Sequence, residues 1–326
     1  MADCKLLKQF RRLSSGLFLF YYHILKSNIL AQRMKKLFLI LFIGIILFSC
    51  EKAVNFDLDE SSPKLVVEAT IENNQPPVVV LSKSLDYFSA ISPDILANSF
   101  VRNAEIYVSN GFLTHRLKEY GTPLGSGYTF YYYTSDSTNP GTLFKGELNT
   151  QYSLRIIVEG KEYTSVTTIP FTTKRIDSLF WKQAPGSNDS NKVVLMVKAT
   201  DPPGYGDYIR YFTKRNNEPF FPAINSVFDD QIIDGTSYEV EVERGVNRNF
   251  GLSEGYSFFD KGDSIIFKLS NINKATFDFW RTMEFSYSSI GNPFSSPTKV
   301  LGNIGGGALG YFGGYASQFR TIVIPR

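Results

Sequence analysis

The first residues whose types and spacing could do chemistry are a serine and a histidine. Residues 251–255 read Gly-Leu-Ser-Glu-Gly, which matches the G-x-S-x-G string around the nucleophile of many serine hydrolases. That nucleophile needs a buried strand before it, a helix after it and a histidine later in the chain. Neither element is indicated around Ser253, and His115 comes before it. We therefore expect a turn serine and a histidine on an exposed strand.

Aspartates form two groups that could cleave glycosides as paired carboxylates or bind calcium through their oxygen atoms. Asp229 and Asp230 lie close to Asp234, and Asp260 lies close to Asp263. Both groups are in turn-like sequence with glycine nearby, and neither fits the calcium-binding loop of an EF-hand. We expect solvated loops here and no metal site.

A run of glycines near the end of the chain matches a cofactor-binding fingerprint only as a string. Residues 305–310 fit G-x-G-x-x-G, which in a dinucleotide site opens a helix and precedes an acid by about 20 residues. No acid follows Gly310, and no Lys-Ser or Lys-Thr pair completes a phosphate-binding loop. We expect no cofactor, but a loop with positive φ angles and close backbone approach.

Aromatic residues are the strongest candidates for contacts with a ligand or a partner. They make up 15% of the chain, and several are adjacent, so on a strand they project to both faces and cannot all be core. Exposed rings can stack on sugars or anchor a protein interface. The alternative is that these residues are aromatic because they fill the core of a β-sandwich and favour strands. The candidates are Tyr131, Tyr132, Tyr133, Phe220, Phe221, Tyr311 and Phe312.

The elements that must position these residues are mainly β-strands. Short stretches rich in Val, Ile, Tyr and Thr alternate with turn residues, and Asn110-Gly111 between two such stretches is a strong hairpin signal. We expect residues 63–172 to form an immunoglobulin-like or prealbumin-like β-sandwich. Residues 173–326 are predicted to form a second β-rich domain with one helix near 273–287, where apolar residues recur at helical spacing.

The start of the chain is typical of a targeting segment. Residues 34–49 begin Met-Lys-Lys and continue with an apolar run too short for a comfortable membrane span, as in a bacterial lipoprotein signal peptide. Cys50 follows directly and would carry the lipid, a diacylglyceryl group on its thiol and an acyl chain such as palmitate on its amine. The alternative is an uncleaved anchor with a chance cysteine.

Two further segments flank this signal. We interpret residues 1–33 as an upstream extension from a wrongly assigned start, with a first membrane helix over residues 16–30 as the alternative. Residues 50–62 read as a tether whose acidic side chains resemble a signal for export to the cell surface, with an ordinary solvated linker as the alternative.

Charge argues against nucleic acid as a partner. The whole chain has a formal net charge of +3, from 34 basic and 31 acidic side chains. Residues 1–49 hold eight of the basic and one of the acidic side chains, so the mature chain would have 26 and 30, a net charge of −4. A protein that binds nucleic acid needs a basic surface, which this balance does not provide.

Several motifs, in their order and spacing, resemble one known family. They are Cys-Glu-Lys at 50–52, Pro-Lys-Leu-Val-Val-Glu at 63–68, Lys-Ala-Thr-Phe-Asp-Phe-Trp at 274–280, Asn-Pro-Phe-Ser-Ser-Pro at 292–297 and Gly-Tyr-Phe-Gly-Gly-Tyr at 310–315. Over residues 50–326 the chain resembles the "domain of unknown function 4249" family of Bacteroidota lipoproteins. The resemblance implies an outer-membrane lipoprotein, often encoded beside a TonB-dependent transporter, and supplies no catalytic residues.

We therefore expect a lipid-anchored outer-membrane protein that is not an enzyme and lies at the cell surface, with the periplasmic face as the alternative. Its expected partners are the membrane, through Cys50, and a TonB-dependent transporter that it would serve as a binding or accessory protein. One alternative is a secreted or surface hydrolase of glycan or peptide. The other is a structural or adhesive surface protein.

Overall fold

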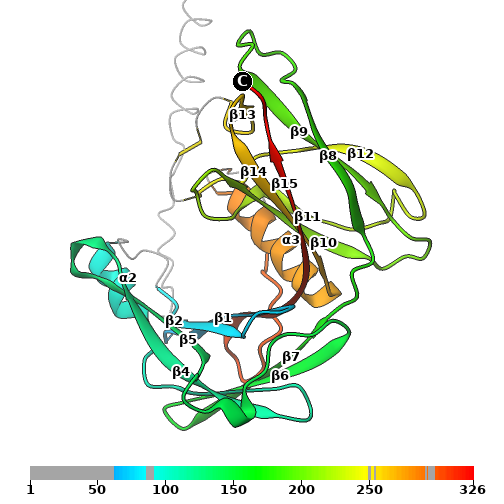
Figure 1. Ribbon diagram of the computed structural model, residues 1–326. Coiled ribbons are helices and arrows are strands. Elements are labelled where there is room, and N and C mark those ends of the chain that lie inside the picture. The colour runs from blue at the N-terminus through cyan, green and yellow to red at the C-terminus, as the bar shows by residue number, and fades with distance from the viewer. Residues whose placement is uncertain (1–61, 86–91, 249–250, 253–254, 291, 293–297) are drawn as a thin grey trace, which may run out of the picture. The chain divides into compact units, whose positions relative to one another are not determined.

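The computed structural model describes most of the chain after residue 61 (Figure 1). The described residues are 62–85, 92–248, 251–252, 255–290, 292 and 298–326. The predicted upstream extension, the signal peptide, Cys50 and the tether up to residue 61 lie outside them, as does Ser253. Within the described residues, no helix is both long and apolar enough to cross a membrane.

Strands dominate the described residues, as predicted. The first half contains β1 (Leu65–Glu72), β2 (Val78–Lys83), α2 (Pro93–Ser99), β3 (Glu105–Ser109), β4 (Thr114–Pro123), η1 (Gly125–Gly127), β5 (Thr129–Ser135), η2 (Pro140–Thr142), β6 (Thr150–Val158) and β7 (Lys161–Ile169). The second half contains β8 (Arg175–Gln183), β9 (Lys192–Thr200), β10 (Tyr208–Arg215), β11 (Phe221–Phe228), β12 (Ser237–Val242), β13 (Phe259–Asp260), β14 (Ser264–Ile272), α3 (Lys274–Ser288) and β15 (Leu309–Val323). The expected hairpin at Asn110-Gly111 is present, since β3 and β4 pair antiparallel across it.

One large sheet runs through both halves, with the strand order β11-β10-β14-β15-β1-β2-β5-β4-β3-β6-β7. In a smaller sheet, β9 pairs with β8, β12 and β13. The last strand, β15, joins the halves (Figure 1). Its residues 309–315 pair parallel with β1, and its residues 315–323 pair antiparallel with β14. The two ends of the described chain thus meet in one sheet.

Glycines allow β15 to approach β1 closely. Gly310 has a φ of +100°, and a Cβ atom there would collide with the carbonyl oxygen of Val67. Gly306 and Gly307 in the preceding loop have φ angles of +78° and +84°. These values confirm the loop expected at residues 305–310, because glycine alone adopts such angles freely and leaves room for a second backbone.

The two largest hydrophobic core clusters of the described residues lie one in each half. The first includes Val67 and receives Phe312 from β15. The second includes Leu195 of the small sheet and Phe267 of β14. This arrangement agrees with the sandwich packing expected from the sequence. The described residues form one compact unit, and the predicted division into two domains stays a prediction.

Helix α3 confirms the helix predicted near 273–287. Asn273 caps it, because its Oδ1 accepts a hydrogen bond from the Thr276 N–H at 2.9 Å. This N–H is one of the first-turn donors that have no partner within a helix. The helix packs on β10, β11 and β15, and it closes one side of the cavity described next.

Candidate functional site

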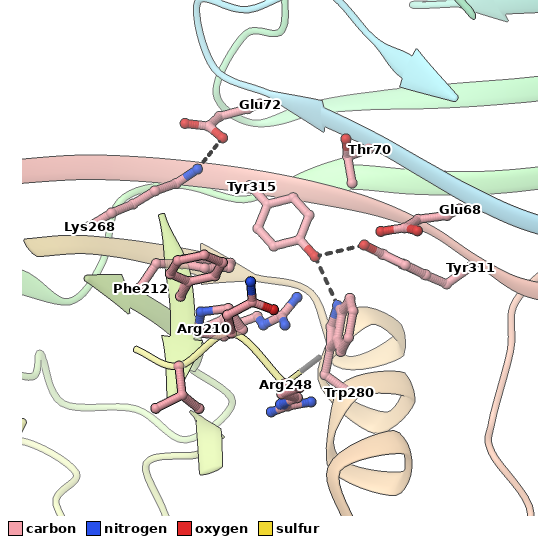
Figure 2. Close-up of a pocket in the computed structure, with 14 residues that line it drawn as sticks. Glu68, Thr70, Glu72, Arg210, Phe212, Arg248, Lys268, Trp280, Tyr311 and Tyr315 are labelled. Atoms are coloured by element: carbon pink, nitrogen blue, oxygen red, sulfur yellow. Dashed lines mark hydrogen bonds and ion pairs between the residues drawn. The ribbon is translucent and has the colours of Figure 1, made fainter. Parts of the chain in front are cut away.

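Strand β1 presents polar side chains to a cavity of about 470 Å³ (Figure 2). Val67 and Ala69 are buried in the first core, and successive side chains on a strand point to opposite faces. Glu68, Thr70 and Glu72 therefore lie on the other face of β1, where they line the cavity. The alternation of apolar and polar residues in β1 is thus what brings two carboxyl groups to one wall.

Basic side chains from other elements also line the cavity (Figure 2). They are Arg210 on β10, Lys268 on β14 and Arg248 in the segment after β12. Lys268 Nζ forms an ion pair with Glu72. Arg248 Nη2 donates to two carbonyl oxygens of β11, each at 2.9 Å, and lies 3.3 Å from Glu284 Oε1.

Arg210 is buried and held in place by neighbouring side chains. Its Nε donates to Ser226 Oγ at 3.1 Å, and its guanidinium carbon lies 3.4 Å from the centroid of the Trp280 ring, a cation–π contact. Trp280 Nε1 in turn donates to the Tyr315 hydroxyl at 2.9 Å, and that hydroxyl donates to the Tyr311 hydroxyl at 3.4 Å. One connected set of side chains therefore holds this wall in place.

Glu68 is the charged group of the cavity with the fewest partners. Its side chain opens into the cavity, and within the described part of the chain it forms no hydrogen bond or ion pair. Glu68 remains exposed to solvent in the cavity, but the protein around it removes part of its hydration, which raises its pKa, and the positive charge of Arg210 partly opposes that shift. Burial also raises the pKa of Tyr311 well above its ordinary value, so this hydroxyl stays protonated at neutral pH.

The structure brings two of the seven candidate aromatic residues to the cavity, Phe221 and Tyr311. Phe220 lies at the surface beside Phe319, and Phe312 is fully buried in the first core. The three tyrosines of β5 do not line the cavity: Tyr131 and Tyr132 are half-buried, and Tyr133 is buried.

The sequence analysis missed the charged side chains of the cavity. Glu68 and Glu72 could have been predicted from the sequence, because they alternate with apolar residues that are buried on β1. No comparable signal exists for Arg210, Arg248 and Lys268, because only the folded chain brings them together.

His115 is buried, so its predicted position on an exposed strand is wrong. It is 1% exposed, because it lies on the same inward face of β4 as Leu117. The Asp136 N–H donates to Nε2 at 2.9 Å, so Nδ1 carries the ring proton and donates to Thr142 Oγ1 at 2.7 Å. Burial lowers the pKa of His115, and the charge of Asp136 partly opposes the shift. Both ring nitrogens are thus engaged in structural hydrogen bonds.

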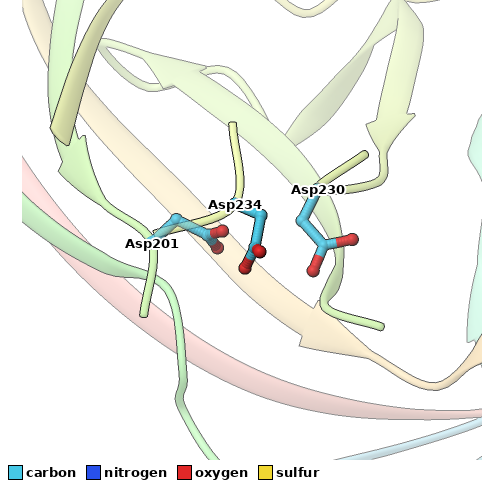
Figure 3. A group of neighbouring side chains, drawn as sticks. All are labelled: Asp201, Asp230 and Asp234. Atoms are coloured by element: carbon cyan, nitrogen blue, oxygen red, sulfur yellow. The ribbon is translucent and has the colours of Figure 1, made fainter. Parts of the chain in front are cut away.

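The first aspartate group is not a solvated loop as expected, because the segment after β11 folds back against the end of β9. Asp230 is 2% exposed, and carboxylate oxygens of Asp201, Asp230 and Asp234 lie within 4.8 Å of one another (Figure 3). Such a set could hold a hard cation such as calcium. The chain itself already supplies a cation there, since the buried Lys174 Nζ lies 3.3 Å from Asp201 Oδ1. Burial raises the pKa of Asp201, and Lys174 opposes that shift.

The second aspartate group is an ion-pair network, which also corrects the expectation of a solvated loop. Arg215 Nε donates to Asp263 Oδ2 at 2.6 Å, and Arg215 Nη2 donates to Asp260 Oδ2 at 2.9 Å. Burial alone would raise the pKa of Asp263, but hydrogen bonds from Arg215, the Asp260 N–H and Asn216 lower it overall. The network fastens the end of β10 to the start of β14.

Comparison with known proteins decides which family the chain belongs to. The model of the family described as domain of unknown function (DUF4249) matches residues 51–321. The chain is a member of the DUF4249 family. None of the curated proteins compared with this DUF4249 chain matches it.

Segments that carry the family resemblance meet at the cavity of this DUF4249 protein. Glu68 ends the motif at 63–68, and Trp280 ends the motif at 274–280. The motif at 310–315 contributes two further lining residues. The cavity in Figure 2 is therefore the strongest candidate for the functional site.

Proposed function

We propose that this DUF4249 protein is a ligand-binding lipoprotein, anchored through Cys50 in the outer membrane of a Bacteroidota bacterium and accessory to a TonB-dependent transporter. The signal-like residues 34–49 and the family match support the anchor. The acidic tether supports the cell surface as the side of the membrane. The transporter as partner is supported by the family resemblance.

The binding role is carried by the charge arrangement of the cavity. Glu68 and Glu72 lie on one wall, where Lys268 pairs with Glu72, and Arg210 and Arg248 also line the cavity. A small molecule with an ammonium and a carboxylate group matches this arrangement: its ammonium binds Glu68, and its carboxylate faces the basic side chains. Free amino acids and short peptides with unblocked ends are such molecules.

The two arginines of the cavity are held in place by contacts within the protein. Arg210 is fixed by Ser226 and Trp280, and Arg248 by backbone oxygens and Glu284. Side chains that are already ordered lose little conformational freedom when a ligand binds, which favours affinity. This rigidity suits recognition of a small ligand of fixed charge pattern.

A hydrolase of glycan or peptide is the second candidate, because Glu68 opens into the cavity without a hydrogen-bond or ion-pair partner among the described residues, and its raised pKa suits a carboxyl that donates a proton. The assay is the release of products from polysaccharide or peptide substrates. Release by the wild-type protein but not by Glu68→Gln would replace the binding role with catalysis.

The anchor is tested by changing Cys50 to alanine in the producing cell. Acyl chains hold a protein at a membrane by burying CH₂ groups, each contributing about 0.8 kcal/mol. We expect the wild-type protein in the outer-membrane fraction and the Cys50→Ala variant released from it. A variant that still fractionates with the outer membrane would contradict lipidation at Cys50.

The accessory role is tested by purifying the tagged protein from membranes after mild crosslinking. We expect a TonB-dependent transporter to co-purify at a fixed ratio, and to be lost when the tag is on an unrelated lipoprotein. Recovery of the protein without a transporter would contradict the accessory role. It would not affect the ligand-binding role of the cavity, which is tested separately.

A further inference from the structure

A second cavity, of about 520 Å³, opens between the two sheets of the C-terminal half. Its lining comes from β9 and β12 of the small sheet, from β10, β11 and β14 of the large sheet, and from α3. Its volume is in the range of pockets that hold small ligands, roughly 300–1,000 Å³. No polar residue of the first cavity belongs to it.

The inner part of this cavity is apolar. Val197 and Ala199 of β9 face Ile209, Phe267 and Leu269 across the space between the sheets, and all five are less than 10% exposed. These side chains offer a ligand dispersion contacts and removal of apolar surface from water, and no hydrogen bonds.

The mouth of the cavity carries apolar side chains that face solvent. Ile232 is 95% exposed, Phe228 45% and Val240 44%. All three line the cavity together with the buried residues, so apolar surface continues from the core to the outside. A ligand with an extended apolar chain would cover both parts at once.

The charges at the mouth select against an anionic ligand. Asp229 and Arg281 line it, whereas Glu241 pairs with Met196 of β9, so its side chain lies on the face of the small sheet opposite to Val240. Arg281 Nη1 lies 3.9 Å from Asp229 Oδ2, so these two charges compensate each other. Among the lining residues no unpaired cation is left to receive the carboxylate of a fatty acid, which would lose hydration without compensation.

We propose that this cavity binds one neutral aliphatic molecule, with its chain between the two sheets and an uncharged polar end at the mouth. The binding surface consists of the inner apolar residues on β9, β10 and β14 and the mouth residues Phe228, Ile232 and Val240. This site is separate from the charged cavity, so the binding proposal for one cavity can be wrong while the proposal for the other is right.

The test is photolabelling of the full chain in its native membrane vesicles with a twelve-carbon primary alcohol that carries an alkyl diazirine. Mass spectrometry then maps the labelled peptides. We expect saturable labelling on β9, β12 and β14, reduced at least 10-fold by excess dodecanol. Dodecanoate should compete at least 10-fold more weakly than dodecanol, because no unpaired cation at the mouth compensates the charge of its carboxylate.

One mouth variant and one control variant make the test specific to the cavity. Val240→Asp places a second carboxylate at the mouth and should reduce labelling at least 10-fold, whereas Val166→Asp, at a similarly exposed valine of β7, should leave it unchanged. Because these side chains are largely exposed, the variants should fold.

Several results would overturn the proposal. Labelling that does not saturate, or that spreads evenly over the surface, would mean membrane partition only. Equal competition by dodecanoate and dodecanol would contradict the neutral head group. If Val240→Asp instead dissociates a dimer and the alcohol labels no strand, the apolar mouth is a protein interface and the proposal is wrong.

Discussion

At the scale of single residues, buried charge is what the fold must compensate. Asp263 is 5% exposed and depends on Arg215, which donates to it at 2.6 Å. An unpaired buried carboxylate is costly, whereas an exposed ion pair contributes little. Arg155 and Glu162 form such an exposed pair, with about half of each side chain accessible, and they serve as a matched comparison.

The first prediction concerns Arg215→Ala, which should lower the free energy of unfolding by about 2–3 kcal/mol at pH 7. Asp263 has a lowered pKa, so its contribution is full above its ordinary value of 3.8 and is lost as the pH falls through the lowered pKa. The difference between wild type and variant, from urea unfolding, should therefore shrink below about pH 4.

The comparison variant is Arg155→Ala, which should change the free energy of unfolding by less than about 0.5 kcal/mol. A pH-independent difference for Arg215→Ala, or an equal loss for Arg155→Ala, would show that Arg215 does not act through the carboxylate of Asp263.

The second prediction concerns Gly310→Ala, where a Cβ would collide with the backbone of Val67 and φ is +100°. We expect a loss of at least about 3 kcal/mol in the free energy of unfolding, from backbone strain and separation of β15 from β1. Gly307→Ala has a similar φ of +84° and open space around it, so it should cost only about 1 kcal/mol. Equal losses would mean that close approach of the strands is not what requires Gly310.

At the scale of elements, α3 depends on its cap. Asn273 Oδ1 accepts from Thr276 N–H at 2.9 Å, and Asn273 Nδ2 donates to Thr167 Oγ1 at 3.1 Å. The cap therefore also ties the start of α3 to β7. Since α3 carries Trp280 into the charged cavity, its stability bears on the site.

The third prediction is that Asn273→Ala lowers the free energy of unfolding by about 1–2 kcal/mol, measured by urea unfolding. Asn273→Asp keeps an acceptor for Thr276 and should recover most of that loss. Lys274→Ala, at the adjacent exposed position, should change stability by less than about 0.5 kcal/mol. No recovery by aspartate would contradict capping as the reason.

Local elements could be predicted from the sequence because their signals are local. Helical spacing and a capping asparagine located α3, and Asn110-Gly111 located the β3–β4 hairpin. The positive φ angles at residues 305–310 followed from glycine chemistry. These patterns span a few residues, so a single chain displays them without an alignment.

Contacts between distant segments could not be predicted. The burial of His115 depends on Thr142, and the burial of Asp230 depends on a loop that folds against β9. The parallel pairing of β15 with β1 joins opposite ends of the described chain. No short-range pattern reports such partners, and they are also what assembles the charged cavity around Glu68.

At the scale of the whole molecule, one shared sheet brings β1, β10, β14 and β15 together around that cavity. The central claim is that the cavity binds a small molecule carrying an ammonium and a carboxylate group. Glu68→Gln removes the charge proposed to hold the ammonium, and Glu162→Gln, at an exposed position of β7, is the matched control.

The most direct measurement is isothermal titration calorimetry of the wild-type protein and both variants with free amino acids and unblocked dipeptides. Each ligand is paired with its N-acetylated, C-amidated form, which lacks both charges. We expect at least one unblocked ligand to bind the wild-type protein and Glu162→Gln equally, to bind Glu68→Gln at least 10-fold more weakly, and to lose binding when blocked. Equal binding of blocked and unblocked forms, no binding across the whole set, or unchanged affinity in Glu68→Gln would contradict the claim.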